Sequence, residues 1–267
     1  MKELLPPNQF AEWWGDYFYL LDMESVREVL RFIECVLKGL AYMHSHRIVH
    51  RDVTELNIVV NCYRLDGRLS RLGQTLRPHR RTDNVYYAFM DYDQSIMLPS
   101  ETCVKTCLRP IAEWQYGSPQ YKPPDIAPGQ LAYNPFAFDV GMLGNMFRCH
   151  FANVVHYVPA LAPLFDKMTN HLIPQRFTAE EAYAFFQETT KDLDQETLLK
   201  QVKLEFRHEF DSAYWDQLPF DVQRKWDRYR TPATENDPGT SEDVVSESEP
   251  LSKSFVLLCD KVVQITV

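Results

Sequence analysis

One eight-residue segment constrains the fold of this chain more than any other. Residues 50–57 read H-R-D-V-T-E-L-N. Before them, apolar residues recur at three- and four-residue spacing from Val26 to Met43, which predicts a long helix packed on a core and ending near residues 44–47. After them, the apolar run at 57–60 predicts a short strand. The charged segment is therefore expected to form a loop between a buried helix and a strand.

A second apolar run, residues 86–90, predicts a strand that pairs with residues 57–60 as a hairpin. The long polar stretch between the two strands contains Arg64, Arg68, Arg71, Arg77, His79, Arg80 and Arg81. It has few aromatic residues for base stacking, so a solvated loop is favoured over a nucleic-acid site. The formal charge of -9 for the whole chain also argues against a general nucleic-acid binder.

The charged loop matches a catalytic motif in all four fixed positions. His50, Arg51, Asp52 and Asn57 resemble the H-R-D-x-x-x-x-N catalytic loop of eukaryotic protein kinases. Phosphoryl transfer needs a carboxylate near the acceptor hydroxyl, a role for Asp52, and an oxygen ligand for magnesium, a role for Asn57. Taken alone, the segment could also be a charged turn between a helix and a strand.

Residues 89–93, F-M-D-Y-D, resemble the D-F-G segment of the same family. The resemblance implies that Asp91 binds the magnesium that bridges the ATP phosphates. Tyr92 keeps an aromatic ring at the family's Phe position. Asp93 replaces the glycine, which removes the freedom to adopt a positive φ and is expected to restrict the loop. A strand-end acidic turn is the alternative interpretation.

Two further segments resemble family motifs in the expected order. Residues 117–125, G-S-P-Q-Y-K-P-P-D, resemble the end of the activation segment, with Asp125 in place of the family's Glu. The resemblance implies a buried ion pair between Asp125 and Arg176. It also implies that Asp139 anchors the catalytic-loop backbone, that Arg51 braces the activation segment, and that His50 is structural.

These matches indicate a mostly α, protein-kinase-like C-terminal lobe with a small β-hairpin at the catalytic loop. The variant residues within these motifs resemble those of a fungal-type kinase-like family. Thr178 and Glu181 fit a capping box that opens a helix running toward Thr189. More helices are expected at 137–151, 196–210 and 220–229. The expected organisation is a kinase-like lobe at 1–192, a helical extension at 193–230, a disordered acidic linker at 231–250 and an apolar segment at 251–267.

The parts of a kinase that grip ATP are missing from the sequence. There is no G-x-G-x-x-G, the only lysines before His50 are Lys2 and Lys38, and Thr54 stands where Ser/Thr kinases have a catalytic-loop lysine. An absent N-lobe is therefore expected, with an exposed apolar surface over Asp52 and Asp91 and a partner that covers it.

The resemblance implies ATP and Mg as cofactors and a Ser/Thr hydroxyl of a protein substrate as the acceptor. Transfer by this chain alone is expected to be weak or absent, since the parts that position the nucleotide are missing. The alternative is a pseudokinase-like scaffold or interaction module.

The sequence also bears on compartment. Pro6 and Pro7 occupy the place where a signal peptide needs an apolar core, and no apolar run reaches the roughly 18 residues of a membrane-spanning helix. Six scattered cysteines favour free thiols in a reducing compartment, and Cys103 and Cys107 lack a second pair at zinc spacing. A location in the cytoplasm or nucleus, without membrane contact, is expected.

Overall fold

The computed structural model describes residues 14–16, 23–61, 85–113, 120–127, 129–207, 214–216 and 218–230. For residues 14–16 it describes the backbone only. All of these residues belong to one compact unit, Met1–Thr231. The arginine-rich loop, residues 117–119, the acidic linker and the segment 251–267 lie outside the described residues, so the predictions for them stay predictions.

The long helix α2 (Val26–Ser45) begins and ends where the sequence predicts. Ser25 caps it by accepting a hydrogen bond from the backbone N–H of Glu28, and the Glu28 carboxylate accepts one from the N–H of Glu24 in return. The stripe of apolar residues along one face is buried. That face forms one wall of the core.

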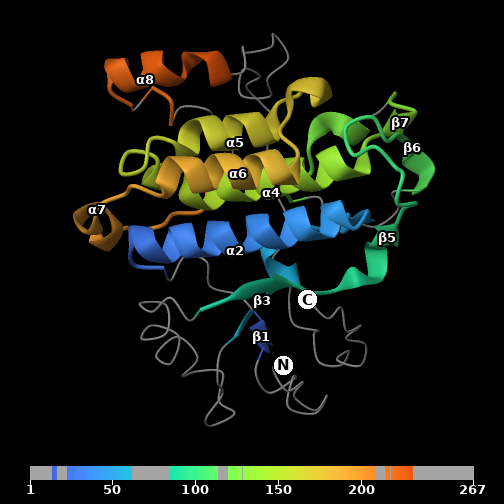
Figure 1. The fold of residues 1–267 in the computed structure, drawn as a ribbon, viewed down its shortest axis with the longest axis horizontal. Coiled ribbons are helices and arrows are strands. Elements are labelled where there is room, and N and C mark those ends of the chain that lie inside the picture. The colour runs from blue at the N-terminus through green and yellow to red at the C-terminus, as the bar shows by residue number, and fades with distance from the viewer. Residues whose placement is uncertain are drawn as a thin grey trace, which may run out of the picture. The chain divides into compact units, whose positions relative to one another are not determined.

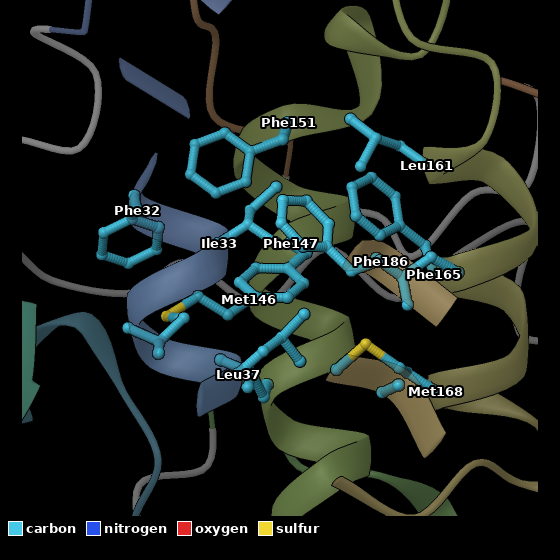
Figure 2. Close-up of a cluster of buried hydrophobic side chains, with 14 of the residues drawn as sticks. Phe32, Ile33, Leu37, Met146, Phe147, Phe151, Leu161, Phe165, Met168 and Phe186 are labelled. Carbon is cyan, nitrogen blue, oxygen red and sulfur yellow. The ribbon is translucent and has the colours of Figure 1, made fainter. Parts of the chain in front are cut away.

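Three more helices complete the core: α4 (Pro135–Phe151), α5 (Leu161–Thr169) and α6 (Ala179–Thr190). Helix α2 packs against α6, and α4 packs against α5 (Figure 1). Figure 2 shows the side chains from all four helices that meet in the core, among them Phe32, Phe147, Phe165 and Phe186. The capping box predicted at Thr178 is present at the start of α6.

The strands are short and surround the charged loop. β3 (Ile58–Asn61) lies between β1 (Trp14–Asp16) and β4 (Tyr87–Phe89), and both pairings are antiparallel. β2 (Ile48–Val49) pairs with β5 (Ile96–Met97). β6 (Arg109–Pro110) pairs with β7 (Ala132–Tyr133). As a result, residues 50–57 connect β2 to β3, and residues 90–95 connect β4 to β5.

Short 3₁₀ turns lie in the connections between these elements. They lie at Glu55–Asn57, Tyr92–Gln94, Ile111–Glu113, Pro124–Ile126, Ala152–Val154, Ile173–Gln175 and Asp227–Tyr229. The described part of the chain is therefore mostly helical with a few small strands, as predicted. This composition is compatible with a kinase C-terminal lobe.

The helix predicted at 196–210 is wrong for most of its length. Helix α7 (Gln195–Leu199) ends after five residues, and residues 200–207 run without helix. Their backbone bonds elsewhere, since the Val26 N–H donates to the Lys200 carbonyl and the Val202 N–H to the Glu24 carbonyl. These tertiary hydrogen bonds replace the local helical ones. Helix α8 (Phe220–Trp226) lies within the predicted range 220–229.

The apolar residues of β3 are covered. Ile58, Val59 and Val60 are all buried, whereas Leu56 and Tyr86 are 50% and 52% exposed. Leu56, in the charged loop, thus exposes apolar surface, and the expected partner that covers such a surface stays a prediction. Within the described residues, no helix combines the length and apolarity that crossing a membrane would require.

Candidate active site

The charged loop is anchored by one buried carboxylate on α4. Asp139 accepts hydrogen bonds from the backbone N–H groups of His50 and Arg51, both at 2.7 Å, and its Oδ2 lies 3.2 Å from Nε2 of His44. The Asp139 side chain is fully buried. Arg51 has a φ of 67°, a region that non-glycine residues seldom adopt, which orients two consecutive N–H groups toward one carboxylate. The loop therefore holds its shape by backbone contacts to α4.

His50 links the loop to the end of β4. Its Nε2 lies 3.0 Å from the Met90 carbonyl, and its Nδ1 accepts a hydrogen bond from the Asp52 N–H at 3.3 Å. These partners assign the imidazole as an Nε2–H donor. The ring centroid lies 5.4 Å from the centroids of both Phe89 and Tyr92. His50 thus joins the charged loop to the residue that follows β4, and its structural role stays a prediction.

Asp52 and Asn57 are in direct contact. The Asn57 side-chain amide donates to the Asp52 carbonyl at 2.9 Å and to its carboxylate Oδ2 at 2.8 Å. Both amide hydrogens are used in this way, so the amide oxygen Oδ1 is the part of Asn57 that is left to accept from a ligand or to bind a cation. The structure therefore brings these two predicted site residues together.

Asp91 follows β4 immediately. The Met90 N–H donates a hydrogen bond to the Asn57 carbonyl at 2.9 Å. Asp91 therefore directly follows a residue that is hydrogen-bonded to the charged loop. Asp91 is exposed, and its backbone has the left-handed conformation with a φ of 59°. Its carboxylate makes no hydrogen bond to the 3₁₀ turn that follows it. Asp93 has no positive φ, so the conformation seen here does not need a glycine at that position, and the expected restriction of the loop stays a prediction.

Arg51 connects two parts of the segment that follows Asp91. Its guanidinium donates to the carbonyls of Gln94 and Glu113. Glu113 is held in turn by two hydrogen bonds from Arg109, both at 2.8 Å. The expectation that Arg51 braces this segment matches these contacts.

Asp125 and Arg176 form the expected ion pair. Two hydrogen bonds of 2.6 and 2.8 Å join the guanidinium to the carboxylate, and the side chains are 0% and 4% exposed. Arg176 also donates to the carbonyls of Asn170 and Ala137. A Cβ at Gly141 would lie 2.8 Å from the guanidinium, so glycine leaves the space that this arginine occupies. The pair ties residues 124–126 to α4 and to the turn before α6.

A polar network that runs from the exposed Gln120 to the buried pair of Tyr121 and His150 was not predicted from the sequence. The Tyr121 hydroxyl lies 2.9 Å from Nε2 of His150 and accepts from Gln120, which also donates to Glu55 at 3.3 Å. Burial, followed by the Glu55 charge, raises the pKa of Tyr121. Burial lowers the pKa of His150 to about 4. The network connects the charged loop with α4 through Tyr121.

The burial of His150 predicts that the stability of the chain depends on pH. His150 has an unfolded pKa near 6.5 and a folded pKa of about 4, so the unfolded chain binds the extra proton between these values. As the pH falls from 6.5 to 4, this group should lower the free energy of unfolding by about 3 kcal/mol at most. Urea unfolding of the wild type and of His150→Gln at pH 7 and pH 4 measures this loss in the free energy of unfolding. Equal acid losses in both proteins would contradict the prediction.

Comparison with known proteins gives a partial match. No family model matches the chain. The chain is 27% identical over 162 residues to "Mitogen-activated protein kinase HOG1" of Blumeria graminis, which covers 52% of this chain and 41% of that kinase. The match thus spans less than half of the length of that kinase. It suggests a protein-kinase-like relationship for the chain.

Proposed function

We propose that the chain is a protein-kinase-like domain whose charged loop binds Mg-ATP and directs phosphoryl transfer to a Ser/Thr hydroxyl of a protein. The observation that carries the proposal is the pair of hydrogen bonds from Asn57 to Asp52, in a loop whose backbone is anchored by Asp139. Catalysis of phosphoryl transfer is mostly positioning and charge stabilisation, and this loop is rigidly positioned.

The donor groups at the site fit magnesium. Mg²⁺ prefers oxygen ligands and is usually bound through one or two carboxylates together with substrate phosphates. Asn57 offers its amide oxygen, since its amide hydrogens face Asp52, and Asp91 offers an exposed carboxylate. In the described residues, no three His, Cys, Asp or Glu side chains gather as a metal site, so an all-protein cage is not available there. ATP, when bound, supplies the phosphoryl group and further oxygen ligands.

Each residue of the site then has a defined task. Asp52 orients the acceptor hydroxyl and accepts its proton, and Asn57 holds the Asp52 carboxylate in place. Arg51 keeps the segment after Asp91 against the loop. Thr54 is buried at the position of the family's lysine, so one cation that stabilises the transferred phosphoryl is replaced by a neutral residue. We therefore propose slow transfer.

Thermal unfolding with and without Mg-ATP tests the proposal. Nucleotide at a hundred times its Kd should stabilise the folded chain by about 2.7 kcal/mol. Asp91→Asn should remove most of this shift, because the exposed carboxylate is the charged ligand. Asp192→Asn, which changes an exposed carboxylate in the turn after α6, should keep it.

The same measurement separates the proposal from a pseudokinase-like scaffold. One sequence feature favours the scaffold, namely Thr54 in place of the family's lysine. If the wild type shows no shift at any Mg-ATP concentration, the nucleotide-binding function is contradicted and the scaffold remains. If Asp91→Asn keeps the full shift, the assignment of Asp91 is wrong.

A further inference from the structure

Two thiols lie at the ends of one closed turn between β5 and β6. The backbone N–H of Cys107 donates to the Cys103 carbonyl at 3.0 Å, and the N–H of Thr106 donates to the same carbonyl at 3.3 Å. A bond from residue i+4 to residue i spaces the two Cα atoms as in one helical turn, about 6 Å. A disulfide spans Cα separations of roughly 4.4–6.8 Å. The Cα separation of this turn therefore lies within the range that a disulfide spans.

The turn is held on both sides. Arg47 donates to the Thr102 carbonyl at 2.7 Å, and Asn134 donates to the carbonyls of Val104 and Lys105 at 2.9 and 3.1 Å. The Lys105 ammonium lies 2.6 Å from the Glu181 carboxylate. These contacts come from the end of α2, the N-cap of α4 and the first turn of α6. The two cysteines are thus presented on a fixed backbone.

Cys103 differs from the other described cysteines in its exposure and in the direction of its pKa shift. Cys103 is exposed and Cys107 is half-buried. Hydrogen bonds from the hydroxyl and N–H of Thr106 lower the pKa of Cys103, which favours its thiolate. Burial raises the pKa of Cys107, and the nearby Cys103 charge raises it further. Burial raises the pKa of Cys149 to about 12, which leaves that thiol inert.

We propose that Cys103 and Cys107 form a peroxide-reactive thiol pair, with Cys103 as the attacking thiol and Cys107 as the resolving one. This proposal does not rest on the proposed kinase function. The Cys103 thiolate attacks one oxygen of hydrogen peroxide, the O–O bond breaks, and Cys103 becomes a sulfenic acid while the other oxygen leaves as water after protonation. Cys107 sulfur then attacks the Cys103 sulfur, the S–O bond breaks, and a second water leaves. The two thiols are oxidised by two electrons, and the peroxide is reduced to two waters.

The experiment uses the full purified chain, reduced and then freed of reductant. One equivalent of hydrogen peroxide is added, remaining thiols are alkylated with iodoacetamide, and trypsin digestion is followed by non-reducing mass spectrometry. Lys105 lies between the two cysteines, so trypsin separates them in the reduced chain and leaves them joined in the disulfide. The expected product is the joined pair of peptides, lighter by two hydrogen atoms.

Variants assign the two roles. In Cys107→Ser, Cys103 should stop at the sulfenic acid, which dimedone traps. Cys103→Ser should leave Cys107 reduced, and Cys149→Ser should oxidise like the wild type. Without peroxide, iodoacetamide should label Cys103 at least about tenfold faster than Cys149 at neutral pH.

Three results would each overturn the proposal. The first is oxidation elsewhere in the chain while Cys103 and Cys107 stay reduced. The second is a disulfide between two chains through Cys103 in place of the internal one. The third is oxidation of Cys107 at an unchanged rate in Cys103→Ser.

Discussion

Arg176→Ala is expected to lower the free energy of unfolding by about 3–5 kcal/mol. The substitution leaves the Asp125 carboxylate, 4% exposed, without its partner in the interior. It also removes the donors to the carbonyls of Asn170 and Ala137. A buried charge that loses its partner is costly, because water does not replace the lost bonds. Urea unfolding at neutral pH measures the loss.

A matched control separates burial from charge. Lys191 pairs with Glu188 at the surface, where the side chains are 53% and 71% exposed, so Lys191→Ala should lower the free energy of unfolding far less than Arg176→Ala does. The double variant Arg176→Met, Asp125→Ala should lose less stability than the sum of its two single variants, since each single variant leaves one buried charge without its partner and the double variant leaves none. Equal midpoints for Arg176→Ala and Lys191→Ala would contradict a buried pair.

Asp139→Ala is expected to have an effect of similar size, about 3–5 kcal/mol, for a different reason. It leaves the backbone N–H groups of His50 and Arg51 unpaired in the interior, at about 1–3 kcal/mol each, and removes the partner of His44. The charged loop then loses its anchor on α4. Amide hydrogen exchange tests this directly, because the N–H groups of His50 and Arg51 should lose their protection.

The conservative variant sharpens this test. Asp139→Asn keeps one side-chain oxygen as an acceptor, so it should lose part of the stability and protect one of the two amides at most. Asp192→Asn, at the surface, should leave the exchange of both amides unchanged. Unaltered protection of His50 and Arg51 in Asp139→Ala would show that the loop is held by other contacts.

Local patterns in the sequence predicted the helices well. The stripe from Val26 to Met43 and the capping box at Thr178 depend on residues close together in the chain, and both appear as predicted. The prediction of a helix at 196–210 is wrong because it used only neighbouring residues, whereas the conformation of this segment is decided by a distant part of the chain. Pairing of residues 200–202 with the backbone at 24–26 competes with helix formation, and no periodicity reveals such pairing.

The contacts of the candidate site were likewise predicted only in part. Motif resemblance pointed to Asp139 with the loop and to Arg176 with Asp125, and the structure shows both contacts. The network of Glu55, Tyr121 and His150 depends on positions that are close only in the folded chain, and no motif marks Glu55 or His150. The left-handed backbone of Asp91 also has no local signal, since its sequence neighbours include no glycine.

The pairing of residues 200–202 with the start of α2 bears on how the chain folds during synthesis. The Glu24 carbonyl and the Val26 N–H bond to residues that leave the ribosome only after almost the whole described region has been made. Contacts between such distant segments form late, because the intervening chain must be ordered first. A nascent chain that lacks residues 200–202 therefore cannot yet form the hydrogen bonds that join them to Glu24 and Val26 at the beginning of α2.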